Sequence, residues 1–212
     1  MRAVTNVPRS YYREAVAQLR HFRKTLRDPR TGLWGHARGW FDDPRAVTKV
    51  HWGRGQGWIL RGLLETLTWL PPRSAEARQV RSWLRELAKS SLRYQTPDGM
   101  WRQVADGPDS YAETSATGLI VYCFARAVRQ GYLPARPYED AARRGWTALT
   151  RDFVRADGTV TGACQGTPPQ KTLDDYFKRE TPVNDPHGVA AVIFACSGRL
   201  LLAGKGRIPP VE

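Results

Sequence analysis

Apolar and polar residues alternate with helical periodicity in six segments of two kinds. Three segments carry an apolar stripe at three- and four-residue steps and a charged opposite face: 10–26, 74–93 and 138–153. Three other segments are apolar on nearly every side: 57–70, 115–129 and 188–203. An amphipathic helix covers a core, whereas a helix that is apolar all round is enclosed by protein. The pattern therefore predicts an all-α chain in which outer and inner helices alternate.

The segments between these helices also repeat. Each outer helix is followed by a glycine turn, namely DPRTGLW (28–34), TPDGMW (96–101) and RADGTV (155–160). Asp and Gly supply the turn, and an aromatic or β-branched residue follows, as in a short strand. A polar loop then leads into the next inner helix. Because the unit recurs three times, about every sixty residues, we expect a partial α/α toroid of about three helical hairpins, with residues 1–212 as one domain.

The three polar loops are predicted to lie at one end of this array. They contain HWGRGQGW (51–58), DSYAETSAT (109–117) and NDPHG (184–188), and each directly precedes an inner helix. Helix N-termini carry partial positive charge and free N–H groups. We therefore expect an anion-binding end lined with Trp, Arg, His and Tyr.

The loop HWGRGQGW contains candidate sugar-binding residues. Trp52 and Trp58 flank Arg54; indole faces stack on sugar rings, and a guanidinium holds a carboxylate in a bidentate fork. Glycines allow close backbone approach. Alternatively, the two Trp are core aromatics and Arg54 is a surface charge. A dinucleotide-binding loop is excluded, because no strand precedes the glycines.

Three further side chains are weaker, catalytic candidates. His36 follows the first glycine turn, Glu113 lies at a helix start, and Asp185 precedes the last inner helix. Helix capping and an Asx-Pro turn are the alternatives for the two carboxylates. Tyr111 and His187 lie in the same loops and complete the expected substrate-binding set. Neither HExxH nor a Cys/His cluster occurs, so we expect no metal and no cofactor.

The charge composition of the chain is compatible with an anionic partner. The 212 residues include 33 Lys+Arg and 20 Asp+Glu, a net charge of +13 that suits nucleic acid, a membrane surface or an acidic sugar. The Arg residues are scattered over helix faces, as on an ordinary solvated surface, and no nucleic-acid reading motif is present. Hydrophobic content of 41% with eight Trp excludes a disordered chain.

The sequence further suggests a cytoplasmic protein. No apolar run reaches the ~18–20 residues that span a membrane, and MRAVTNVPRS has no apolar signal-peptide region. Cys123, Cys164 and Cys196 are odd in number and far apart. We therefore expect buried thiols in a reducing compartment.

Nine segments together resemble one enzyme family. In order they are TGLWGH, HWGRGQGW, RYQTPDGMWRQV, PDSYAETSAT, GYL, AARRGW, DGTVTGACQGT, DYFKRE and VNDPHG. They resemble the unsaturated glucuronyl/galacturonyl hydrolases of glycoside hydrolase families 88 and 105, most of all the unsaturated rhamnogalacturonyl hydrolases of pectin degradation. The resemblance implies a six-hairpin toroid acting on a terminal sugar acid with a C4–C5 double bond. It places His36, Trp52, Arg54 and Trp58 around that sugar.

The sequence departs from the family at three places. Gln56 stands where the family commonly has Asn, and Gly53 where it often has Ala. The family also carries a catalytic Asp, in a Trp-x-Asp-type motif, before the stretch matched here by TNVPRSYYREAV, and only MRAV precedes that stretch here. We therefore expect a C-terminal half, produced by a misplaced start, a frameshift or a gene split, that is inactive alone.

Half a toroid leaves apolar surface uncovered. We expect the helices at 57–70 and 115–129 to expose more than the ~300–600 Å² patch of a typical monomer, which favours self-association. Three functions stay open: a hydrolase of unsaturated uronyl oligosaccharides that needs its other half, a catalytically dead sugar-acid binding module, and a basic nucleic-acid or interaction protein.

Overall fold

The computed structural model describes residues 9–204, so MRAV and the first part of the TNVPRSYYREAV stretch lie outside it. This part of the chain forms seven helices: α1 (Arg9–Leu26), α2 (Gly53–Trp69), α3 (Ala75–Arg93), α4 (Thr114–Arg129), α5 (Ala135–Asp152), α6 (Leu173–Phe177) and α7 (Pro186–Leu202). The predicted short strands are reduced to isolated bridges, such as Arg27 with Trp34 and Val154 with Val160. All six predicted helices are present.

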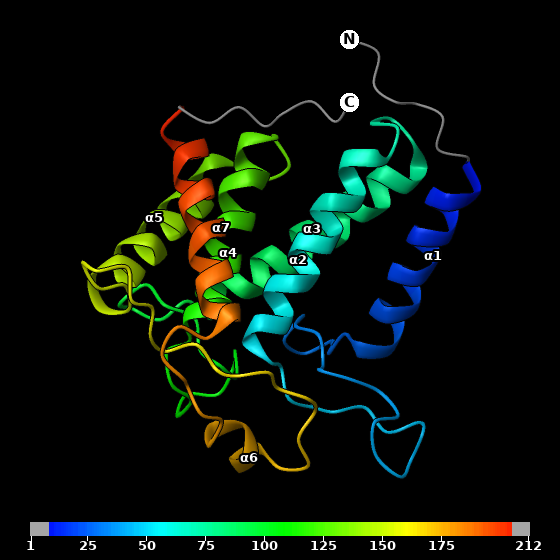
Figure 1. The fold of residues 1–212 in the computed structure, drawn as a ribbon. Helices are drawn as coiled ribbons and strands as arrows, with labels where there is room; N and C mark the ends of the chain where they lie inside the picture. The colour runs from blue at the N-terminus through cyan, green and yellow to red at the C-terminus, as the bar shows by residue number, and fades with distance from the viewer. Residues whose placement is uncertain (1–8, 205–212) are drawn as a thin grey trace.

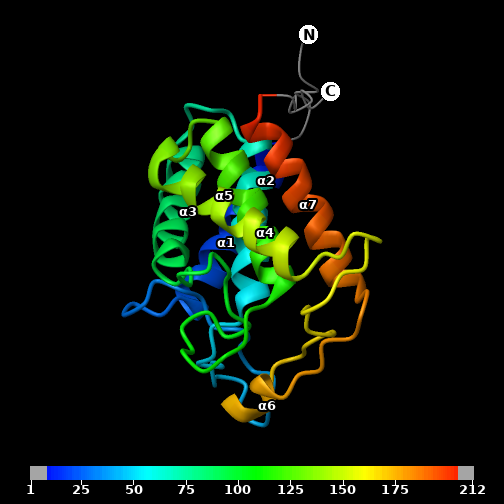
Figure 2. The same cartoon turned by 90° about the vertical axis from the view of Figure 1, so that its left-hand side faces the viewer.

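Outer and inner helices alternate as predicted. Figures 1 and 2 show α2, α4 and α7 side by side, with α3 and α5 covering one side of them. Helix α4 is central, since it packs against α2, α5 and α7. The three predicted glycine turns are confirmed by the positive φ angles of Gly32 (75°), Gly99 (102°) and Gly158 (86°). The internal repeat of the sequence is therefore a structural repeat.

Helix α2 begins at Gly53, inside the segment that the sequence predicted as a loop. Two glycines of its first two turns are packing positions. A Cβ at Gly53 would lie 2.1 Å from the Arg102 carbonyl oxygen, and one at Gly57 would lie 2.7 Å from Leu119 Cβ. These glycines allow the first two turns of α2 to pack closely against α4 and the loop at 102. The close approach is therefore between parts of the protein rather than to a ligand.

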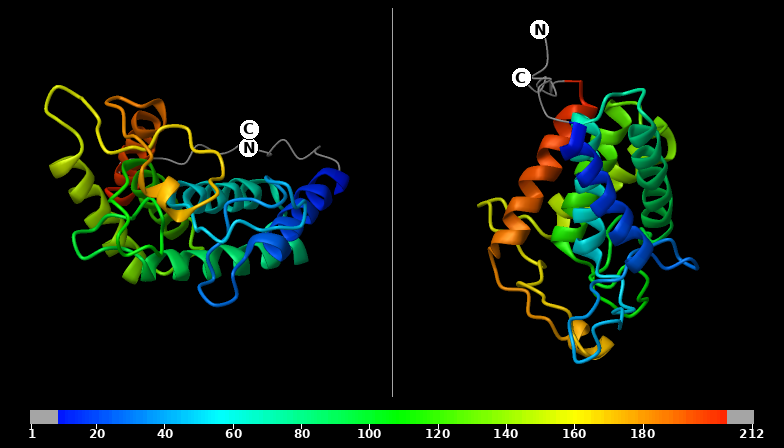
Figure 3. Two further views of the ribbon diagram at one scale, coloured as in Figure 1. Left: turned by 90° about the horizontal axis from the view of Figure 1, so that it is seen from below. Right: turned by 90° about the vertical axis from the view of Figure 1, so that its right-hand side faces the viewer.

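The uncovered apolar surface differs from the prediction. The helix at 115–129 is almost wholly buried, because α2, α5 and α7 enclose it. The helix at 57–70 does expose Trp58 and Trp69, as expected for α2, and α7 exposes Ile193 and Leu200 in place of the second predicted helix. These side chains lie at the two ends of the row of inner helices α2, α4 and α7. Figure 3 shows α1 at one side and α5 and α7 at the other. The described helices therefore form an open arc.

Two smaller features were not predicted. Helix α6 interrupts the long connection between α5 and α7, with a capping box of Thr172 and Asp175 at its start. Cys123 and Cys164 are buried free thiols, but Cys196 is exposed on α7, so the prediction of three buried thiols is wrong for Cys196. Among the helices described, none is long and apolar enough to cross a membrane.

Candidate functional site

The predicted shared end exists. The N-termini of α2, α4 and α7 lie at the same end of the molecule as α6 and the connecting loops (Figure 1). The side chain of Glu113 caps α4 and that of Asp185 caps α7, whereas Trp52, the residue before α2, makes no side-chain cap. We expected all three helix N-termini to be available to an external anion. Two of them already hold a carboxylate of the protein itself.

Three of the predicted site residues meet around the indole of Trp52. The imidazole of His36 lies with its centroid 4.4 Å from the Trp52 ring, inclined by 34°. The guanidinium carbon of Arg54 lies 4.8 Å from the centroid of the same ring, a cation–π distance. His36 comes from the turn after α1, and the other two come from the start of α2. The sequence-based expectation that these three cluster is confirmed.

A groove between α1 and α2 borders this cluster. Its volume is about 350 Å³, within the range of small-ligand pockets. His36, Trp52 and Trp58 line it together with mostly apolar neighbours: Leu19, Phe22, Leu26, Trp34, Gly35, Gly55, Gln56, Ile59 and Gly62. The buried amide of Gln56 exchanges two hydrogen bonds with the backbone of Trp34, at 2.7 and 3.0 Å. Gln56 thereby fixes one wall of the groove.

Arg54 has surroundings that the sequence did not predict. Its side chain is buried, so the alternative of a surface charge is wrong. It donates to the carbonyl oxygens of Cys164 (2.7 Å) and Gln165 (2.8 Å) and to the hydroxyl of Ser115 (3.3 Å). The guanidinium thus ties the connection before α6 to the start of α2. These three bonds use only part of the five N–H donors of the guanidinium, and its buried Nε has no hydrogen-bond partner among the described residues.

Glu113 is a buried cap. Its carboxylate accepts from the backbone N–H of Ala116 (2.6 Å) and of Cys164 (2.9 Å), and from the hydroxyl of Ser115 (2.8 Å to each oxygen). Because Ser115 also accepts from Arg54, the two buried charges are linked through one hydroxyl. The structure thus shows the capping role that was the alternative for Glu113.

Asp185 has a similar role. Its carboxylate accepts from the backbone N–H of His187 (2.9 Å) and contacts the Nδ1 of the same residue at 2.8 Å. The Asx-Pro turn expected as the alternative for Asp185 is therefore present, and the same carboxylate caps α7. His187 is exposed, and its ring approaches Gly166 rather than the groove.

Tyr111 lies apart from the groove too. Its hydroxyl donates to the carbonyl of Arg179 across 3.4 Å, and burial raises its pKa. Tyr111 lies near Cys164, and His187 lies near Gly166, so both adjoin the segment that Arg54 holds at Cys164 and Gln165. The six predicted binding residues thus form two groups, with Arg54 between them.

Sequence reasoning missed Tyr176. Its ring is fully buried, and its hydroxyl lies 2.6 Å from the Nδ1 of His36. The available signal was an aromatic pair in DYFKRE, within an otherwise polar connection. Burial and the charge of Arg54 lower the pKa of His36 from 6.5 to about 4, so the imidazole is neutral at neutral pH.

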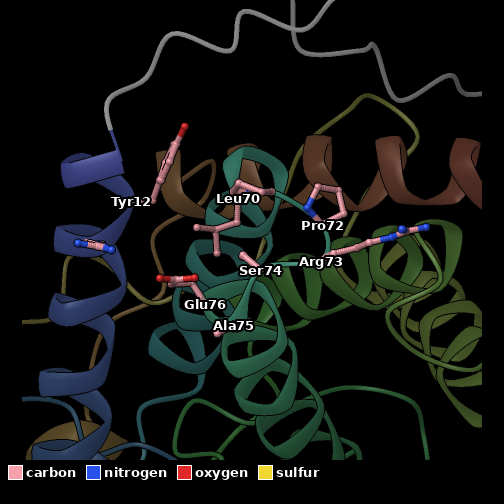
Figure 4. A pocket seen from close by; sticks show the side chains of 9 residues that line it. Tyr12, Leu70, Pro72, Arg73, Ser74, Ala75 and Glu76 are labelled. Carbon is pink, nitrogen blue, oxygen red and sulfur yellow. The ribbon is translucent and has the colours of Figure 1, made fainter.

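A larger cavity lies at the other end of α2 and contains none of the predicted residues. Its volume is about 560 Å³, and its lining includes Tyr12, Leu70, Pro72, Arg73 and Glu76 (Figure 4). Among the described residues its lining has no indole and no imidazole, whereas the groove is lined by three Trp and by His36. The candidate site is therefore the smaller groove.

Comparisons with known proteins agree on one family. The model described as Glycosyl Hydrolase Family 88 matches residues 1–202. The unsaturated 3S-rhamnoglycuronyl hydrolase of Formosa agariphila is 31% identical over 154 residues, which cover 71% of this chain and 40% of that protein. Protein Atu3128 of Agrobacterium fabrum is 30% identical over 182 residues, which cover 77% of this chain and 78% of that protein.

A solved structure gives the architecture. The crystal structure of a possible member of the GH105 family from Salmonella enterica aligns with a TM-score of 0.81 and 26% identity, covering 90% of this chain and 50% of that one. The described helices are therefore part of an α/α toroid. The chain spans less than half of the Formosa hydrolase, half of the solved structure and most of the Agrobacterium protein.

Proposed function

Because the chain belongs to glycoside hydrolase family 88, we propose that it binds the unsaturated uronyl end of an oligosaccharide, as part of a hydrolase for that linkage. The proposed substrate is a Δ4,5-unsaturated galacturonyl–rhamnose type oligosaccharide; the name of the Formosa relative supports an unsaturated sugar acid joined to rhamnose. The observation that carries the proposal is the packing of His36 and Arg54 on Trp52 beside the groove.

The groove residues suit such a ligand. The indoles of Trp52 and Trp58 offer apolar faces to a sugar ring, and neutral His36 offers a hydrogen bond. The charge of Arg54 acts in a buried region, where the low dielectric strengthens its attraction for a carboxylate. The net charge of +13 favours approach of acidic sugars from solution.

The chemical step implied by the family is a hydration. A carboxylic acid protonates C4 of the vinyl ether, its carboxylate assists addition of water at C5, and the resulting hemiketal collapses to release the next sugar. Glu113 and Asp185 are both engaged as helix caps. We therefore propose that residues 1–212 act as one domain, the three-hairpin part of a six-hairpin toroid, and that the acid comes from outside the described residues.

The engagement of Glu113 and Asp185 as helix caps also favours a second function, a binding module. Within residues 9–204 these two are the candidate acids, so a chain that keeps Trp52, His36 and Arg54 would bind a sugar acid without turning it over. This binding module and the hydrolase share one ligand. They differ in whether the double bond is consumed.

Binding is tested by fluorescence. Titration with an unsaturated galacturonyl–rhamnose disaccharide should quench Trp emission, and Trp58→Phe should remove most of the quench. Trp69→Phe is the matched control, because Trp69 is a similarly exposed indole at the opposite end of α2. Equal quenching of both variants would argue against the groove as the site.

Turnover is tested by ultraviolet absorbance. The hydrolase reaction removes the conjugated double bond, so its absorbance should disappear with the complete toroid and persist with this chain alone. A decrease with this chain alone would contradict a role confined to binding. Affinity for DNA that falls steeply with salt, with no response to sugar, would instead indicate a nucleic-acid protein.

The proposed location is the cytoplasm. Cys123, Cys164 and Cys196 are all free thiols, which fits a reducing compartment. Fractionation of cells that express the protein would test this location.

A further inference from the structure

Tyr176 does not line the groove itself but contacts His36, which does. It belongs to α6, and its ring is fully buried. The backbone N–H of Gln170 donates to its hydroxyl oxygen at 3.2 Å, and the Nδ1 of His36 lies 2.6 Å from the same oxygen. These are the only hydrogen-bond partners of the hydroxyl within residues 9–204.

The direction of the second bond follows from the hydrogens available. A phenol carries one hydrogen, and a buried hydroxyl that accepts from Gln170 has His36 Nδ1 as its one acceptor. The hydroxyl therefore donates to Nδ1, which must lack a hydrogen. A neutral imidazole with a bare Nδ1 carries its hydrogen on Nε2.

The other nitrogen of His36 is free. Nε2 makes no hydrogen bond to residues 9–204, and it is absent from the buried polar atoms that lack partners, so solvent reaches it. The ring itself lines the groove. We infer that Tyr176 is a positioning residue that holds His36 as the neutral Nε2–H tautomer, so that the groove presents an N–H donor to its ligand.

Neighbouring groups support the neutral form. The indole of Trp52 packs on the imidazole, and both burial and the charge of Arg54 disfavour protonation of His36. An N–H donor suits a ring oxygen, a hydroxyl or a carboxylate of a sugar acid. The match to a sugar acid rests on the proposed function, whereas the assignment of the tautomer does not.

Nuclear magnetic resonance tests the tautomer directly. The chain has four His residues, so a long-range ¹H–¹⁵N spectrum of the His-labelled protein contains four imidazoles, and His36→Asn identifies one of them. At pH 7 the spectrum should show His36 with bare Nδ1 and protonated Nε2. Protonated Nδ1 in the unmodified protein would overturn the inference.

A variant tests the role of Tyr176. Tyr176→Phe keeps the buried ring and removes the hydroxyl, so the His36 signals should shift toward a mixture of the two tautomers. Tyr138→Phe is the control, because Tyr138 is a buried tyrosine on α5 that packs on Phe124, away from the groove. Unchanged His36 signals in Tyr176→Phe would refute the positioning role.

Sugar binding completes the test. Tyr176→Phe should weaken binding of the unsaturated disaccharide about fivefold, the value of one hydrogen bond. Added to His36→Asn, it should cause no further loss, because it acts through His36. A comparable loss in that background would contradict the inference. If the unmodified protein binds no sugar, the proposed function fails, while the tautomer spectrum still decides the role of Tyr176.

Discussion

Arg54 and Glu113 are buried charges of opposite sign, with the hydroxyl of Ser115 hydrogen-bonded to both. Removing one member of such an arrangement is costly, because the other charge stays buried without compensation. Between them these side chains also hold the backbone of Cys164. The site therefore depends on a structural network directly behind Trp52.

Glu113→Ala should lower the free energy of unfolding by about 3 kcal/mol. It removes the acceptor of two buried N–H groups and the partner charge of Arg54. Urea unfolding followed by Trp fluorescence measures the loss. Glu14→Ala, at an exposed position on α1, should change stability by less than about 0.5 kcal/mol. Similar values for the two variants would disprove the network.

His36 gives stability a defined dependence on pH. Its pKa is about 4 in the folded protein and 6.5 in an unfolded chain, so the unfolded state binds the proton more readily. The contribution of neutral His36 is complete above pH 6.5 and is lost as the pH falls through about 4. Unfolding free energies at successive pH values should decline over this window, and less so in His36→Asn. Parallel declines would show that other groups cause the effect.

At the scale of helices, glycine decides how closely inner helices approach. A Cβ at Gly118 of α4 would lie 2.5 Å from the carbonyl oxygen of Ala191 on α7, whereas a Cβ at Gly62 of α2 would meet nothing within 4 Å. An alanine at Gly118 therefore tests the packing of α4 on α7, whereas an alanine at Gly62 tests helix propensity alone.

Gly118→Ala should destabilise the protein by about 1–3 kcal/mol, because α7 must move away from α4. Gly62→Ala should stabilise it by about 0.5–1 kcal/mol, through better helix propensity in open space. Urea denaturation of both variants gives the comparison. Stabilisation by both would mean that α4 and α7 tolerate a wider spacing.

The sequence could predict the features set by local periodicity but not those set by contacts between distant segments. Periodicity placed the six long helices, because each buries its own regular stripe. It misplaced the start of α2, since the glycines of GRGQG suggest a loop until the contact between Gly57 and Leu119 is known. The clustering of His36, Trp52 and Arg54 followed from the repeat. The partners of Arg54 did not, because Cys164 lies 110 residues away along the chain.

At the scale of the molecule, the open arc leaves two apolar edges. Trp58 and Trp69 mark the edge at α2, and Ile193 and Leu200 mark the edge at α7. Half of the solved GH105-family chain has no counterpart here, and in a closed toroid both edges would be covered. The net charge of +13 opposes close approach of two copies, while burial of the edges favours it.

We therefore predict self-association through these edges that strengthens with added salt, since salt screens the repulsion but not the apolar contact. Sedimentation measures it at successive salt concentrations. Ile193→Glu should weaken association, because Ile193 is 61% exposed in the middle of the α7 edge. Ser82→Glu adds the same charge at an exposed position on α3 and should leave association unchanged. Only Ile193→Glu alters an edge, so equal weakening by both variants would show that the contact does not lie at the α7 edge. A chain that stays monomeric at high salt would contradict self-association through these edges.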